Sequence, residues 1–251
     1  SKPFGDTDEF AWAPDGKSIV FNVRIAGRTE AWSTNFDLYR ADVAGNSAPV
    51  NLTPDNKAWD AGPVFSADGK TLYYRAMKRP GFEADRFALM AMDLASGKTR
   101  ELAPQWDASA DTIKLSADGK KIYTQAQELG QHPLFSVDIA SGQATRVAGS
   151  GSISAFDLVG DTLVFVRDSL KSPGRLFAAR ANGSGAREVS VNNRDTLAQI
   201  AFGDFEQFNF IGWNNETVHG YVVKPANYEA GKKYPVAFLI HGGPQGSFGN
   251  G

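Results

Sequence analysis

The chain has 251 residues, 42% of them hydrophobic and 22% charged, and its 26 basic residues nearly balance its 28 acidic ones. This composition indicates a globular protein of one or two domains, and the lack of a block of like charge argues against a nucleic-acid partner. With no cysteine in the sequence, disulfides, thiolate metal sites and cysteine nucleophiles are excluded. The longest strongly apolar run, residues 235–240, is far shorter than the roughly 20 residues that a membrane-spanning helix needs.

Two sequence words recur in step through the first three quarters of the chain. The first is SADGK, at 66–70 and 116–120, with a variant APDGK at 13–17 and a weaker copy, VGDTLVFV, at 159–166. Runs of β-branched and aromatic residues follow each copy, which is typical of strands. Asp-Gly between two such runs predicts a hairpin closed by a tight primed turn.

The second word predicts another hairpin in each repeat. Its copies are LYRADVAGN from residue 38, LMAMDLASGK from 89, LFSVDIASGQ from 134 and LFAARANGSG from 176. Two hairpins make four short antiparallel strands per repeat, which is typical of a β-propeller blade. We expect four blades, at about 1–53, 54–103, 104–148 and 149–190, in a partial propeller over 1–196 with further blades upstream. A sandwich that reuses Asp-Gly turns is the alternative, but it would not repeat two words in phase.

After about residue 197 the repeat stops and a different pattern begins. Alternating segments at 205–213 and 217–224 predict an antiparallel hairpin. Residues 235–240 are continuously apolar, which predicts a strand buried on both faces of an α/β sheet. The sequence His241-Gly242-Gly243-Pro244 follows directly. In α/β-hydrolases a loop of this kind after the third strand supplies an oxyanion-hole N–H. The expected fold is therefore mainly β: β-propeller blades followed, over 197–251, by the first strands of an α/β-hydrolase domain.

Taken in order, the propeller words, WNNETVHGYVVKP from residue 213 and YPVAFLIHGGP from 234 resemble the prolyl oligopeptidase family of serine peptidases. The acylaminoacyl-peptidase and dipeptidyl-aminopeptidase-like branch is the most similar. The resemblance implies hydrolysis of short peptides through an acyl-enzyme, with the propeller limiting access to the catalytic cleft. It also implies that the backbone N–H of Gly243 is an oxyanion-hole donor, and that His241 and Pro244 hold the shape of the loop.

The catalytic triad of such an enzyme is not in this sequence. No G-x-S-x-G occurs in the 251 residues, and the three histidines are His132, His219 and His241. His132 falls in a propeller loop, His219 in the hairpin and His241 upstream of any nucleophile, so a structural role is favoured for each. We expect a partial chain that is inactive alone, with the serine, acid and histidine beyond Gly251.

A lengthened propeller segment, residues 77–90, carries the charged residues Glu83, Asp85 and Arg86. Exopeptidases of this family hold the substrate terminus with propeller side chains. A carboxylate suits a free amine, and an arginine suits a carbonyl or carboxylate. These residues are therefore candidates for substrate binding. The alternative is a solvated loop whose charges pair with one another.

A free-standing TolB-like propeller that binds proteins is the competing function, because blades with SADGK turns fit it equally well. The hairpin, the apolar run and HGGP favour the peptidase. No cofactor is expected, since clustered carboxylates at metal-ligand spacing and a phosphate-binding loop are absent from the sequence. Self-association is left open. The lack of cysteine and the style of the repeat favour an exported bacterial protein, and the compartment is otherwise undetermined.

Overall fold

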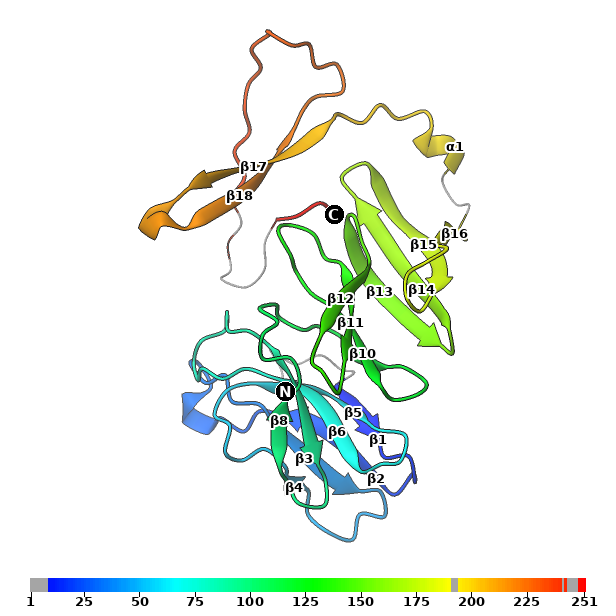
Figure 1. Cartoon of the computed structure of the whole chain (residues 1–251). Coiled ribbons are helices and arrows are strands. Elements are labelled where there is room, and N and C mark those ends of the chain that lie inside the picture. The colour runs from blue at the N-terminus through cyan, green and yellow to red at the C-terminus, as the bar shows by residue number, and fades with distance from the viewer. Residues whose placement is uncertain (1–8, 191–193, 241, 243–247) are drawn as a thin grey trace. The chain divides into compact units, whose positions relative to one another are not determined.

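The computed structural model describes residues 9–190, 194–240, 242 and 248–251. These residues form four four-stranded sheets and one two-stranded sheet (Figure 1). The strands are β1 (Phe10–Trp12), β2 (Ser18–Val23), β3 (Asp37–Asp42), β4 (Val50–Asn51), β5 (Asp60–Phe65), β6 (Thr71–Ala76), β7 (Ala88–Asp93), β8 (Thr99–Glu101), β9 (Lys114–Leu115), β10 (Lys121–Gln125), β11 (Leu134–Asp138), β12 (Ala144–Ala148), β13 (Ser152–Val159), β14 (Thr162–Ser169), β15 (Ser172–Arg180), β16 (Arg187–Glu188), β17 (Phe205–Ile211) and β18 (Thr217–Val223). The helices are short: α1 (Arg194–Leu197) and the 3-10 turns Gly27–Thr29 and Trp213–Asn215.

Each four-stranded sheet is an antiparallel meander of consecutive strands. The orders are β1-β2-β3-β4, β5-β6-β7-β8, β12-β11-β10-β9 and β13-β14-β15-β16. The first word of each repeat joins the first two strands of a sheet, and the second word joins the last two. This is the connectivity of propeller blades, so the predicted four-stranded antiparallel blades are confirmed.

The chain divides into two compact units. Unit 1 comprises Ser1–Ala126 and Phe135–Thr145, and unit 2 comprises Gln127–Leu134 and Arg146–Gly251. This division groups residues by their contacts. The expected boundary between a propeller region at 1–196 and a hydrolase-type domain at 197–251 is a different division of the chain, and it stays a prediction.

The turns of the SADGK words close differently from the predicted primed turn. In the first copy, the Asp68 carboxylate accepts hydrogen bonds from the Ser66 hydroxyl at 2.7 Å and the Lys70 N–H at 3.1 Å. Of the five residues only Gly69 has a positive φ, 69°. The prediction of a tight turn with a left-handed aspartate is wrong, because the side chain of the aspartate closes a longer loop. The same hydrogen bonds lower the pKa of Asp68, chiefly through the Ser66 hydroxyl.

The core of unit 1 consists of apolar layers between neighbouring sheets. Strand β6 lies in the second sheet, and its successive side chains point to opposite faces. Leu72 and Tyr74 pack in one buried cluster with Val20 of the first sheet. Tyr73 packs in another with Ile122 of the third sheet. A blade buried on both faces explains why TLYYRA is apolar almost throughout.

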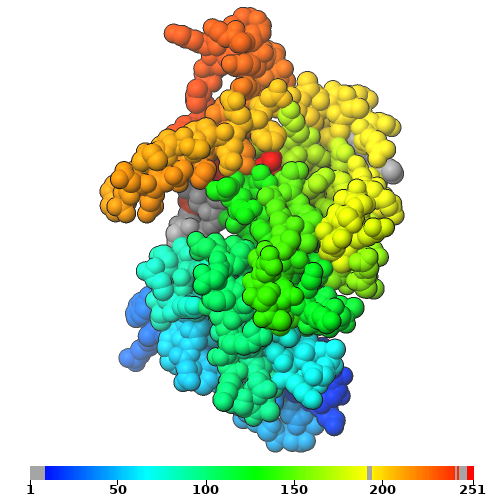
Figure 2. All heavy atoms as spheres, in the orientation of Figure 1, coloured from blue at the N-terminus to red at the C-terminus, as the bar shows by residue number. Residues whose placement is uncertain are grey.

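Unit 2 contains the fourth sheet and the β17–β18 hairpin. In the sheet, the rings of Phe165 and Phe177 stack with centroids 5.5 Å apart. The hairpin pairs without interruption from Phe205 opposite Val223 to Ile211 opposite Thr217, which confirms the hairpin predicted there. Its side chains are largely exposed, Trp213 at the turn by 89%, and Figure 2 shows the hairpin in orange with much of its surface open.

The apolar segment 235–240 is not a strand, so this prediction is wrong. Val236 is 86% exposed, Phe238 79% and Ile240 77%. A strand buried on both faces needs a partner strand along its edge and helices over its faces. Within the described residues no strand pairs with this segment, so its apolar side chains have no layer to pack into.

Candidate functional site

The expected oxyanion residues His241, Gly243 and Pro244 lie outside the described residues. The segments on either side of them are described: the β17–β18 hairpin and the apolar run before, and residues 248–251 after. Both segments belong to unit 2.

The charged loop at 77–87 places Asp85 and Arg86 in hydrogen bonds that hold the loop itself. The Asp85 carboxylate accepts the backbone N–H groups of Lys78 at 2.7 Å and Arg79 at 2.8 Å. Burial raises the pKa of Asp85, but the backbone N–H bonds outweigh it and hold the pKa below its usual value. Glu83 is half-buried in the same loop.

Glu101 is the partner that sequence reasoning missed. Its carboxylate receives Arg86 Nη2 and Lys78 Nζ, each at 2.6 Å, and Arg86 also donates to the Trp106 carbonyl at 3.2 Å. Glu101 lies at the end of β8, outside the loop, and nothing in the sequence indicated that it pairs with Arg86 and Lys78. The structure thus shows what fixes the loop, while a role of Glu83, Asp85 and Arg86 in substrate binding stays a prediction.

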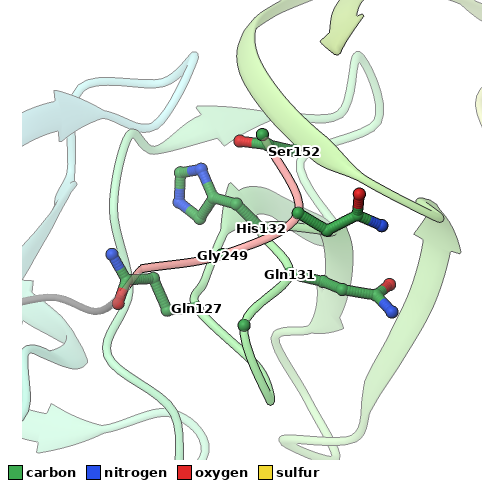
Figure 3. A pocket seen from close by; sticks show the side chains of 8 residues that line it. Gln127, Gln131, His132, Ser152 and Gly249 are labelled. Carbon is green, nitrogen blue, oxygen red and sulfur yellow. The ribbon is translucent and has the colours of Figure 1, made fainter. Parts of the chain in front are cut away.

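A small pocket in unit 2 is lined in part by residues 249–251, which follow the HGGP motif in the sequence. It has a volume of about 130 Å³ and is lined by Gln127, Gly130, Gln131, His132, Ser152, Gly249, Asn250 and Gly251. Figure 3 shows the stretch at Gly249 passing among the side chains of Gln127, His132 and Ser152. Amide, imidazole and hydroxyl groups can hydrogen-bond a polar ligand, but these lining residues include no carboxylate to serve as a triad acid.

The backbone fixes His132 in this pocket. His132 forms a parallel bridge with Ser152, its N–H donating to the Gly151 carbonyl at 3.1 Å and its carbonyl accepting from Ile153 at 2.9 Å. Of the other two histidines, His219 is exposed on β18 opposite Asn209, and His241 is outside the described residues. His132 was expected in a propeller loop; its proximity to residues 249–251 could not be inferred from sequence.

A buried pair of carboxyl groups lies between the first and second sheets. Asp37 begins β3 and is 8% exposed, and Asp60 begins β5 and is 1% exposed. Asn56 Nδ2 donates to one oxygen of Asp60 at 2.8 Å, and Asn51 Nδ2 to one oxygen of Asp37 at 2.9 Å. The other oxygen of each has no hydrogen-bond partner among the described residues. Burial, together with the Asp37 charge, raises the pKa of Asp60 to about 7.

Comparison with known proteins gives the relationship of the chain. No protein-family model matches it. Dipeptidyl-peptidase 5 of Aspergillus fumigatus is 31% identical over 265 residues, which covers 99% of this chain and 36% of the relative. The chain is homologous to dipeptidyl-peptidase 5 over nearly its whole length. This confirms the resemblance to the dipeptidyl-aminopeptidase-like branch of the prolyl oligopeptidase family. The chain spans only about a third of the length of this curated relative.

Solved structures confirm the fold. The acylaminoacyl peptidase of Pyrococcus horikoshii matches with a TM-score of 0.69 at 18% identity, covering 90% of this chain and 33% of its own. TolB from Acinetobacter baumannii matches with a TM-score of 0.53 at 18% identity, covering 72% of this chain and 43% of its own. At such identities the likeness establishes the propeller fold alone. No helix in the part of the chain that the structure describes is long and apolar enough to cross a membrane.

Proposed function

We propose that this chain is the propeller and oxyanion-loop portion of a serine peptidase that releases dipeptides from short peptides. The observation that carries the proposal is the alignment with dipeptidyl-peptidase 5, which covers 99% of the chain. It therefore extends beyond the blades, through the hairpin and the HGGP motif. Aminoacyl or acylaminoacyl release is the other exopeptidase activity that the sequence allows. It has less support, since the acylaminoacyl peptidase is similar in fold alone.

The TolB-like binding module also has less support, because the likeness to TolB is one of fold alone. A free-standing propeller has no need of a hairpin and an HGGP motif after its last blade. Residues 197–251 align with a peptidase, whereas the TolB likeness covers 72% of the chain and is one of fold. Peptide recognition is therefore better supported than scaffold binding.

The exposed apolar surface of residues 205–240 supports a place in a larger domain. Trp213, Val236 and Phe238 are each exposed by more than three quarters. Large apolar side chains that stay exposed are typical of segments that pack against another layer. In this proposal residues 1–196 are the propeller, and 197–251 open an α/β-hydrolase domain whose further strands and helices cover this surface.

The chemistry assigned to this portion is electrostatic. The Gly243 N–H donates to the oxygen that becomes negatively charged when a serine attacks the scissile carbonyl, while His241 and Pro244 keep the loop in shape. Loss of one such donor costs about a hundred- to a thousandfold in rate. Attack by the serine hydroxyl gives the acyl-enzyme and releases the amine, and water then releases the dipeptide. The nucleophile, its histidine and its acid come from residues that follow Gly251.

The test compares this 251-residue chain with a longer protein that carries the residues following Gly251. We expect no turnover of a dipeptidyl chromogenic substrate by the chain, and turnover blocked by a serine-directed fluorophosphonate in the longer protein. Inhibitor-sensitive turnover by the chain alone overturns the assignment of the triad. A longer protein without peptidase activity overturns the proposed function. The expectations of no nucleic-acid partner and no cofactor stay predictions, as does the question of self-association.

A further inference from the structure

Two loops of unit 1 lie against each other. The first, residues 24–36, joins β2 to β3, and the second, residues 77–87, joins β6 to β7. The Gly81 N–H donates to the Thr34 hydroxyl at 2.8 Å, and Thr34 is 6% exposed. A Cβ at Gly81 would lie 3.7 Å from the Trp32 carbonyl oxygen. The two loops therefore form one surface, which we call the paired loops.

Large apolar side chains of the paired loops face solvent. Ile25 is 72% exposed, Trp32 69% and Phe82 38%. A single exposed apolar residue is ordinary, but several of them on adjoining loops are typical of a binding surface. Tryptophan in particular is one of the residues that contribute most to the binding energy of protein interfaces.

Hydrogen bonds fix the backbone beneath these side chains. In the first loop, the Trp32 N–H donates to the Thr29 carbonyl at 3.1 Å, within a tight turn. In the second loop, the Asp85 carboxylate accepts the N–H groups of Lys78 at 2.7 Å and Arg79 at 2.8 Å. A ligand therefore binds without having to order the loops, which lowers the entropic cost of binding.

The charges of the paired loops leave arginines available to a ligand. Glu30 is engaged by Arg24, at 3.0 Å. The Arg79 guanidinium lies over the ring of Phe82, 3.9 Å from its centroid, and Arg28 on the first loop is exposed. Among the described residues neither Arg28 nor Arg79 is in an ion pair. The surface thus combines exposed aromatic rings with unpaired positive charge.

We propose that the paired loops bind an acidic peptide segment, with Trp32 and Arg79 as its main contacts. A guanidinium holds a carboxylate through two parallel N–H bonds, and an exposed indole packs against an apolar side chain. A nucleic acid fits less well, because its phosphates are bound by many cations and the paired loops offer only Arg28 and Arg79 unpaired among the described residues. This binding goes beyond the proposed function and does not depend on turnover.

Fluorescence anisotropy of a labelled peptide with the 251-residue chain tests the proposal. The probe is a fluorescein-labelled peptide in which glutamate alternates with leucine, and its counterpart has glutamine in place of glutamate. Trp32→Ser and Arg79→Gln should each raise the Kd of the glutamate peptide about fivefold or more. The matched controls are Trp213→Ser, at a tryptophan that is 89% exposed in unit 2, and Arg40→Gln, at an exposed arginine of β3. Both controls should leave the Kd unchanged.

The glutamine peptide separates charge recognition from apolar contact. It should bind wild type about fivefold more weakly than the glutamate peptide does, and Arg79→Gln should add little to this loss, because the carboxylate partner is already gone. Equal Kd values of the two peptides in wild type, or a Kd of the glutamate peptide unaffected by both Trp32→Ser and Arg79→Gln, overturn the proposal. Tighter binding of a labelled oligonucleotide that the same two substitutions weaken overturns the choice of a peptide.

Discussion

Replacing Asp60 by asparagine tests whether the buried carboxyl group of Asp60 makes the free energy of unfolding depend on pH. Burial raises the pKa of Asp60 from 3.8 to about 7, with a further contribution from Asp37. An acid with a higher pKa in the folded state binds more protons when folded. The free energy of unfolding therefore falls as pH rises from about 4 to about 7, and levels off above. A shift of roughly three pH units corresponds to about 4 kcal/mol.

The assay is urea unfolding at pH 5 and pH 8. From pH 5 to pH 8 the free energy of unfolding should fall by about 2 to 3 kcal/mol more in wild type than in Asp60→Asn. About two of the three pH units by which the pKa is raised lie above pH 5. The asparagine cannot ionise, so it removes the proton uptake on which this pH dependence rests. Asp68→Asn is the control, since the lowered pKa of Asp68 puts its titration below this range. An equal loss in wild type and Asp60→Asn would refute the reasoning.

Three further predictions concern the turns and the charged loop. Gly142→Ala should destabilise unit 1 more than Gly119→Ala in urea unfolding. Both glycines have a positive φ, but only at Gly142 would a Cβ meet backbone, at 2.3 Å from the Leu102 carbonyl oxygen. Equal effects of the two substitutions would contradict this close approach of the two backbones. Glu101→Gln should speed tryptic cleavage after Lys78, since it removes the carboxylate that holds Arg86 and Lys78, and Asp93→Asn should not. In the longer protein, Glu83→Ala should raise KM severalfold for substrates with a free amine and leave acylated substrates unchanged; an unchanged KM for both retires Glu83 as a binding residue.

The propeller was predictable because its information is local and repeated. A strand needs only alternating or continuous apolar residues over about six positions, and a turn needs Asp and Gly at fixed places. The two words therefore gave the strands, their order and the number of sheets. The turn chemistry was predicted less well. Whether Asp68 contributes its backbone or its carboxylate depends on Ser66 two residues earlier, whose hydroxyl donates to that carboxylate.

The candidate site was less predictable because its contacts are long-range. Residues 235–240 have the composition of a buried strand, but burial is a property of the neighbours, and in this chain Phe238 and Ile240 remain exposed. The glycines of the final FGNG gave no sign that one of them lies against Gly130, more than a hundred residues earlier. Composition indicates which structures a segment can form, and the contacts in the folded chain determine which of them it forms.

This difference explains why HGGP identifies the family without describing the site. A short motif specifies a backbone shape that can donate an N–H to an oxyanion. Its distance from a substrate carbonyl depends on what holds each end, and here one end leads from exposed apolar residues while the other reaches Asn250, which is 7% exposed. The motif therefore indicates which chemistry is available, while the contacts of the residues around it set its geometry.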